Sequence, residues 1–212
     1  PLTTLQGLAP AKVNLFLHVG PPGEDGYHPL CSLVAFADVG DGVTVTPAER
    51  LSLTVTGPFG ASLGDDPDNL ILRALRALGE VAGIGEPALA VTLDKRLPIA
   101  AGLGGGSSDA GTALKLANQA LALGLDEIGL EEVSRVVGAD GPMCLRGRSA
   151  WAVGIGDRLT DEPRLPVLHA VLVNPGVPSP TGPVYRAYDA AGPAQADCPA
   201  SPGDWSARSV VD

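Results

Sequence analysis

The sequence has few lysines, few aromatic residues and no strongly basic segment. Lysine stands only at positions 12, 95 and 115, and Phe, Trp and Tyr make up 4% of the 212 residues. The formal net charge is −10, which opposes binding to nucleic acids and to anionic membranes because like charges repel. We therefore expect neither nucleic acid nor membrane as a partner. The sequence leaves the oligomeric state open.

Cysteine is also scarce, and its spacing does not indicate a metal site. Cys31, Cys144 and Cys198 lie far apart, with no CxxC pair and no His/Cys spacing typical of zinc. We interpret them as free thiols in a reducing compartment. The first residues lack a basic segment followed by an apolar stretch, and the apolar runs are too short to span a bilayer. These features predict a cytoplasmic protein.

The remaining composition favours a folded chain with a sizeable core, since hydrophobic residues make up 45% and charged residues 18%. Apolar patterning predicts strands over residues 13–19, 33–39, 42–46, 51–56, 88–93, 149–153 and 170–174. Apolar stripes and capping residues predict helices that begin after Asp68, cover 107–122, and run from Asp126 to Gly138. Because these elements do not alternate regularly as βαβ units, the fold class is predicted to be α+β.

The densest cluster of glycine precedes the second of these helices. It reads Leu-Pro-Ile-Ala-Ala-Gly-Leu-Gly-Gly-Gly-Ser-Ser-Asp-Ala over residues 97–110. A phosphate needs converging backbone N–H groups, glycine permits that close approach, and a helix N-terminus adds its positive end. The P-loop pattern fails because no lysine follows, and GxGxxG fails because Ser107 stands where the third glycine belongs. A phosphate-binding loop is therefore indicated, with a flexible turn without a ligand as the alternative.

Three segments together resemble the GHMP kinase family. They are Pro-Ala-Lys-Val-Asn-Leu-Phe-Leu at 10–17, Pro-Ile-Ala-Ala-Gly-Leu-Gly-Gly-Gly-Ser-Ser-Asp-Ala at 98–110 and Gly-Ala-Asp-Gly-Pro at 138–142. The resemblance implies the family's N-terminal ATP-binding domain, which is like domain 2 of ribosomal protein S5, over residues 1–160. Residues 161–212 would begin the C-terminal region, with its ferredoxin-like domain absent or only begun. The stretch from about residue 190 is rich in Pro, Ala and Ser and reads as a linker.

Four shorter blocks narrow the resemblance. They are Asp-Gly-Tyr-His at 25–28, Asp-Asn-Leu-Ile at 68–71, Lys-Arg-Leu-Pro at 95–98 and Asn-Pro-Gly-Val at 174–177. They are similar to family members that use ATP, with Mg²⁺, to phosphorylate the 2-hydroxyl of a cytidine diphosphate-linked methylerythritol in isoprenoid precursor synthesis. A family kinase for homoserine, mevalonate or a sugar is one alternative. A non-catalytic nucleotide-binding module is another, because the family's second glycine-rich segment has no match here.

The resemblance implies that Asp140 is the general base and that Lys12 beside it stabilises developing charge. Phosphoryl transfer needs such a carboxylate near the attacking oxygen. From spacing alone, a turn aspartate and a surface lysine are the simpler interpretations. Gly141 stands where family members usually carry valine. The implied ATP-binding residues are Pro98, Ile99, Ala100, Ala101, Gly102, Leu103, Gly104, Gly105, Gly106, Ser107, Ser108, Asn69 and Lys95. Ser108 is also the candidate Mg²⁺ contact. Asn69 could instead serve in the first turn of its helix.

For the cytidine end, the resemblance implies that Tyr27 and Tyr185 stack on the ring while His28 bonds to its edge. Asn14 would orient the methylerythritol portion, with Thr181 nearby. A pyrimidine needs an aromatic face and a few directed polar groups. Without the family context, Tyr27 would be a turn-packing aromatic residue and His28 a strand-end histidine.

Overall fold

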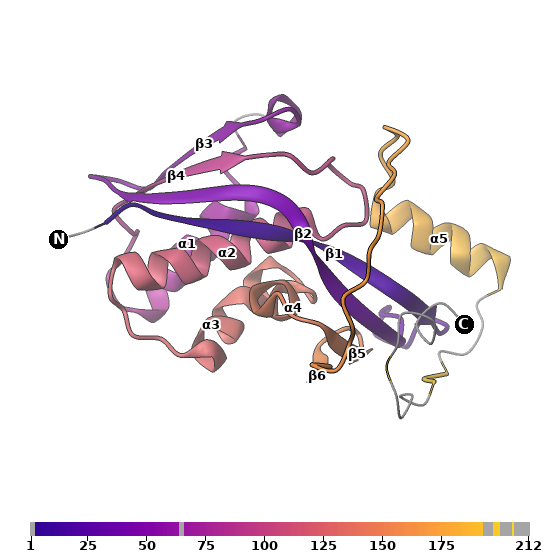
Figure 1. Ribbon diagram of the computed structural model, residues 1–212. Helices are drawn as coiled ribbons and strands as arrows, with labels where there is room; N and C mark the ends of the chain where they lie inside the picture. Colours follow the sequence, from indigo (N-terminus) through magenta and orange to yellow (C-terminus); the bar gives the residue numbers. More distant parts are fainter. Residues whose placement is uncertain (1–2, 64–65, 193–196, 200–204, 206–212) are drawn as a thin grey trace.

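The computed structural model describes residues 3–63, 66–192, 197–199 and 205, which fold around one β-sheet (Figure 1). Its strands are β1 (Leu5–Val19), β2 (Leu30–Pro47), β3 (Ser52–Thr56), β4 (Leu89–Asp94), β5 (Ala150–Gly154) and β6 (Arg158–Asp161). Their order is β3-β4-β2-β5-β6, and β1 pairs with β2 outside this path. The pairing is antiparallel throughout except between β3 and β4, which run parallel.

β2 is the central strand of the sheet. The segments predicted at 33–39 and 42–46 are parts of this single strand of 18 residues. It pairs with β1 over almost its whole length, and it also pairs with β4 near its C-terminal end and with β5 near its N-terminal end. The pairing with β1 shifts register between Pro10 and Lys12, so β1 is locally irregular beside Lys12.

Four helices lie on one face of the sheet (Figure 1). They are α1 (Leu70–Val81), α2 (Gly105–Ala120), α3 (Glu127–Ser134) and α4 (Gly141–Arg146), with short 3₁₀ segments at Gly60–Ser62 and Arg135–Val137. α2 is central, because it contacts β1, β2, α1, α3 and α4. Its predicted inward residues Ala110, Leu114 and Ala117 are fully buried in the main core. The α+β fold class is thereby confirmed.

Capping decides where two of these helices begin. Asp126 caps α3 as predicted, since its side chain accepts a hydrogen bond from the Gly129 N–H at 2.8 Å. The prediction that Asp68 caps α1 is wrong by one residue. Asn69 is the N-cap, and its side chain accepts from the Ile71 N–H at 2.9 Å. Both Asp and Asn suit this position, so the sequence alone did not discriminate between neighbours.

The segment after β6 departs from the prediction. Residues 170–174 form no strand, and Val171 and Val173 are each 87% exposed. Their β-branched side chains favour a strand, but within the described residues no neighbouring strand pairs with them. Helix α5 (Thr181–Ala191) follows and was not predicted. Most of the stretch predicted to be linker-like, from about residue 190, lies outside the described residues.

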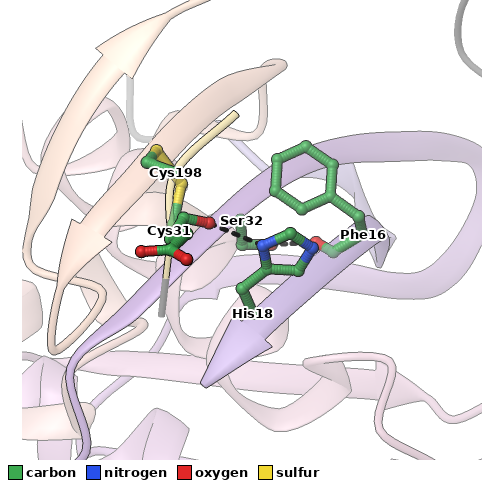
Figure 2. Close-up of a disulfide and its surroundings, with 6 residues drawn as sticks. Phe16, His18, Cys31, Ser32 and Cys198 are labelled. Carbon is green, nitrogen blue, oxygen red and sulfur yellow. Dashed lines mark hydrogen bonds between the residues drawn. A yellow bond between two sulfur atoms is a disulfide. The ribbon is translucent and has the colours of Figure 1, made fainter. Parts of the chain in front are cut away.

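A disulfide joins β2 to the C-terminal part of the chain. Cys31 is bonded to Cys198 across a sequence separation of 167, beside Phe16 and His18 of the neighbouring strand (Figure 2). The interpretation of three free thiols is therefore wrong for two of them, because spacing along the sequence says nothing about cysteines that the fold brings together. Cys144 is free and buried. Within the described residues, no helix is both long and apolar enough to cross a membrane.

Candidate active site

The glycine-rich loop connects β4 to α2. Gly102 and Gly104 have φ angles of +73° and +62°, in the left-handed region that favours glycine. α2 begins at Gly105, two residues earlier than predicted. The Lys12 N–H donates to the Leu103 carbonyl at 2.8 Å, which fastens the loop to the irregular part of β1. The first N–H groups of α2 have no partner within the helix and are available to an anion.

The two predicted catalytic residues lie close to the start of α2. The Ser107 hydroxyl donates to Asp140 Oδ1 at 2.9 Å. The Lys12 side chain runs against Gly104, where an added Cβ would lie 3.1 Å from Lys12 Cβ and Cε. Lys12 and Asp140 form no ion pair in the part of the chain that the structure describes, but the charges of both act on the thiol of Cys144. The loop, the lysine and the carboxylate thus share one neighbourhood.

Gly141, directly after Asp140, is packed tightly. It is buried, and an added Cβ would meet the Ser134 carbonyl oxygen at 2.2 Å. Its N–H donates to the Gly138 carbonyl at 3.0 Å. The start of α4 therefore lies directly against the end of α3, and this close approach fixes the turn that carries Asp140.

Ser108 is fully buried, and its hydroxyl has no hydrogen-bond partner among the described residues. The nearby Cys144 thiol is neutral, because burial and then the charge of Asp140 raise its pKa to about 12. An unpaired buried hydroxyl at the start of a helix is suited to bind a phosphate oxygen or a hydrated cation. The predicted Mg²⁺ contact of Ser108 stays a prediction.

Lys95 is buried beneath the loop. Its Nζ donates to Asp41 and, at 2.8 Å, to Asp109 Oδ2. The ammonium group is thus bound to two carboxylates, and the main-chain N–H and carbonyl of Lys95 are bonded to Thr56 and Phe59, so the contact of Lys95 with a nucleotide base stays a prediction. Asn69 likewise uses its side-chain oxygen to cap α1, which agrees with the alternative role considered for it.

Two predicted cytidine-binding residues meet at α5. The rings of His28 and Tyr185 lie edge to face, with centroids 4.7 Å apart. His28 Nε2 lies 2.7 Å from Asp189 Oδ1, and partial burial raises the pKa of the Tyr185 hydroxyl. Tyr185 lines a surface cavity, and His28 adjoins the cavity through its contact with Tyr185. The cavity is bounded by Leu17, His18, Val19, Val184, Tyr185, Tyr188 and Asp197.

The other predicted substrate residues are more scattered. Tyr27 is 58% exposed in the turn before β2. The Asn14 side-chain amide donates to the Ser32 hydroxyl at 2.7 Å, and Thr181 is the exposed first residue of α5. One contact connects this region to the nucleotide loop, since the Ser179 N–H donates to the Ala100 carbonyl at 2.8 Å.

Three acidic residues of this region were missed from the sequence: Asp41, Asp109 and Asp189. Asp41 and Asp109 are buried beside Lys95, and Asp189 holds His28. A usable signal existed for the first two. A lysine that becomes buried needs a counter-charge, and Asp109 is an acidic residue within the first two turns of the predicted helix.

The family to which the chain belongs follows from two comparisons. The model of the GHMP kinases N terminal domain matches residues 69–148, which include the glycine loop and Asp140. A protein of Caulobacter sp. (strain K31) is 56% identical over 195 residues, which are 92% of this chain and 67% of that protein. The chain belongs to the GHMP kinase family. The crystal structure of a homoserine kinase from Cytophaga hutchinsonii shares the fold, with a TM-score of 0.55 at 19% identity over 77% of this chain and 52% of that one.

Within the family, several similar proteins share one name. The protein of Caulobacter sp. (strain K31) is a 4-diphosphocytidyl-2-C-methyl-D-erythritol kinase, as is one from Caulobacter vibrioides (strain NA1000 / CB15N), 56% identical over 88% of this chain. A crystal structure of 4-(cytidine 5'-diphospho)-2C-methyl-D-erythritol kinase matches 86% of this chain with a TM-score of 0.71 and 43% identity. The chain spans 64% of the Caulobacter vibrioides protein and 64% of the crystallised one.

Proposed function

We propose that the protein phosphorylates the 2-hydroxyl of 4-diphosphocytidyl-2-C-methyl-D-erythritol with ATP, in isoprenoid precursor biosynthesis in the cytoplasm. The observation that carries the proposal is the hydrogen bond from Ser107, at the start of α2, to Asp140. This bond joins the N-terminus of α2, which would bind phosphate, to the Asp140 carboxylate. The high identity to kinases of this name over most of the chain supports the choice of substrate.

The glycine loop would hold the triphosphate. Residues 98–108 supply flexible glycines, the unpaired N–H groups of α2 and the unpaired Ser108 hydroxyl. The Ser108 hydroxyl would bind either a phosphate oxygen or Mg²⁺, and Mg²⁺ when bound neutralises charge on the transferring phosphoryl group. The first turn of α1, at Asn69, and the main chain of Lys95 would border the base.

Asp140 would accept the proton of the attacking 2-hydroxyl. Its Oδ1 already accepts from Ser107, which fixes the carboxylate and leaves its second oxygen for the substrate. Lys12, packed on Gly104, brings a positive charge to the same edge of the loop. That charge would stabilise the γ-phosphoryl group during transfer.

The cytidine end would bind at the cavity beside α5. Tyr185 and His28 supply an aromatic face and a polar ring edge, while Asp189 orients the histidine. Tyr27, Asn14 and Thr181 would complete the site once substrate is bound. In this arrangement, residues 1–160 form the ATP-binding domain, and residues 161–212 begin the substrate-side region.

The experiment has two arms on the 212-residue chain. Calorimetry with ATP and Mg²⁺ measures binding, and ³¹P NMR follows phosphate transfer to the cytidyl substrate, mevalonate, homoserine and galactose. We expect transfer to the cytidyl substrate alone and its loss in Asp140→Asn, while Asp38→Asn, an exposed carboxylate change on β2, has no effect. Turnover of another acceptor without the cytidyl compound refutes the substrate. ATP binding without turnover of any acceptor favours a nucleotide-binding module.

A further inference from the structure

A buried cluster of three charged side chains lies directly under the glycine loop. It consists of Asp41 from β2, Lys95 after β4 and Asp109 from α2, which we call the anchor cluster. The three residues are 0%, 3% and 2% exposed. Lys95 Nζ bridges the two carboxylates. A buried ion cluster of this kind adds little net stability compared with apolar packing, so its presence calls for another explanation.

The anchor cluster binds the residues at the N-terminal end of the glycine loop. Asp41 Oδ1 accepts hydrogen bonds from the N–H groups of Arg96 and Leu97 at 2.6 and 2.7 Å. These two residues immediately precede the glycine loop. The same carboxylate binds Lys95 through its other oxygen. One side chain of β2 thus fixes three consecutive residues at the entrance to the loop.

The anchor cluster also binds the C-terminal end of the loop, where α2 begins. Asp109 lies in α2, four residues after the helix begins at Gly105, and Lys95 ties it to the loop entrance. Gly105 itself rests on the cluster, because an added Cβ would lie 3.0 Å from Lys95 Nζ and 3.6 Å from Asp41 Oδ2. The two ends of the loop are therefore held by the same three side chains.

Of the two carboxylates in the cluster, that of Asp109 accepts fewer hydrogen bonds. Its Oδ1 is buried without a hydrogen-bond partner among the described residues, whereas both oxygens of Asp41 are bonded. Burial, offset in part by Lys95 and reinforced by Asp41, raises the pKa of Asp109 to about 7. The other titratable group facing it, the Cys144 thiol of α4, is neutral. Asp109 is therefore the member of the cluster whose place depends on its bond to Lys95.

We propose that Asp109, acting with Asp41 and Lys95, is a positioning residue that holds both ends of the glycine loop in its phosphate-binding shape and thereby sustains ATP affinity. The statement about ATP rests on the proposed function. The positioning role does not, since it concerns the order of the loop itself.

Two variants test the proposal. Asp109→Asn keeps an acceptor for Lys95, and Asp109→Leu removes it. Amide hydrogen exchange across residues 96–106 reports loop order, and calorimetry reports ATP affinity. Leu114→Ala, a buried change on the same helix away from the cluster, controls for general loss of stability.

We expect Asp109→Leu to lose at least tenfold in both loop protection and ATP affinity, with Leu114→Ala close to wild type in both. Asp109→Asn should keep its loop protection and its ATP affinity within a few-fold of the wild type, because its amide oxygen still accepts from Lys95.

The proposal is overturned if Asp109→Leu protects the loop and binds ATP as the wild type does, or if Asp109→Asn loses as much of both as Asp109→Leu. If Asp109→Leu does not fold, Asp109→Ala takes its place in both measurements. If the wild-type chain binds no ATP, the proposed function fails, while hydrogen exchange still decides the positioning role.

Discussion

The hydrogen bond between Ser107 and Asp140 joins the phosphate loop to the carboxylate that we propose as the base. Removing it should leave the carboxylate in place but free to rotate. Ser107→Ala is expected to lower kcat about tenfold, or about 1.4 kcal/mol in activation free energy, with little change in KM for the acceptor. Asp140→Asn should lower kcat by about 100-fold or more. Steady-state kinetics test both, with Ser52→Ala, an exposed serine of β3, as the control. Wild-type kcat in Ser107→Ala would exclude a positioning role for this hydroxyl.

Asp109 should also make the free energy of unfolding depend on pH. Its pKa is raised from an ordinary value of 3.8 to about 7, so between these values the folded state holds a proton that the unfolded state has lost. Stability then falls as the pH rises, by roughly 1 kcal/mol per pH unit between pH 5 and pH 7, and is level above. Below pH 4 both states are protonated and the effect disappears.

Urea unfolding at pH 5, 6, 7 and 8 measures this dependence as the difference between wild type and Asp109→Asn. The variant should gain relative stability steadily up to pH 7. Asp38→Asn, which alters an exposed carboxylate, should follow the wild type at every pH. A difference between wild type and Asp109→Asn that does not change with pH contradicts a raised pKa.

At the scale of elements, the start of α1 tests a correction to the sequence prediction. The Asn69 side chain accepts from the Ile71 N–H, whereas the Asp68 carboxylate forms a 3.7 Å ion pair with Arg73 at the surface. Asn69→Ala should lower the free energy of unfolding by about 1 kcal/mol, and Asp68→Ala by at most a few tenths. Urea unfolding of the two variants distinguishes the caps. A larger loss in Asp68→Ala would restore the original prediction.

The contact between α3 and α4 depends on the absence of a side chain at Gly141. An added Cβ would lie 2.2 Å from the Ser134 carbonyl oxygen, so the backbone of one helix must move. Gly141→Ala should lower the free energy of unfolding by about 1–3 kcal/mol and lower kcat, because the displaced segment carries Asp140. Gly182→Ala, in α5, meets only the flexible end of Arg186 and should be near neutral. Thermal unfolding and kinetics together test this, and a stable, fully active Gly141→Ala would refute it.

Elements with a local signal could be predicted from the sequence. β4, β5 and the Asp126 cap follow from alternation and capping chemistry within a few residues. The strand expected at 170–174 had the right residues, but a strand needs a partner, and pairing is decided by distant parts of the chain. α5 was missed because Thr181 and Tyr185, which lie in it, were interpreted only as substrate contacts.

The residues of the candidate site also divide into those with a local signal in the sequence and those brought together by the fold. The glycine loop could be recognised because its chemistry is contiguous in sequence. The resemblance to a family supplied Lys12 and Asp140, but the contact between Ser107 and Asp140 spans 33 residues. The anchor cluster spans 54 residues between Lys95 and Asp41. Such clusters depend on sheet order, which local patterns do not determine, and this is why Lys95 was predicted as a nucleotide contact and not as part of a buried ion cluster.

At the scale of the whole molecule, the bond between Cys31 and Cys198 joins β2 to the segment after α5 (Figure 2). It lies next to the contact between His18 Nδ1 and the Asp197 carbonyl oxygen at 2.6 Å. Asp197 and His18 both line the cavity assigned to the cytidine end. The strand that carries Asn14 and the segment after α5 are thereby kept at one end of the sheet. The state of the three cysteines therefore reports whether the chain has this closed arrangement.

Thiol titration of the protein purified without reductant tests whether the bond between Cys31 and Cys198 forms. In the folded chain no thiol should react, because Cys31 and Cys198 are bonded and the buried Cys144 has a pKa of about 12, far above the pH of the assay. Unfolding in denaturant should release one thiol, and denaturant with reductant should release three. Cys198→Ser should give two thiols on unfolding without reductant, since Cys31 loses its partner. Peptide mapping should recover Cys31 and Cys198 in one linked peptide. Three reactive thiols in the unreduced, unfolded wild type would show that the disulfide does not form and that the original interpretation of free cysteines holds.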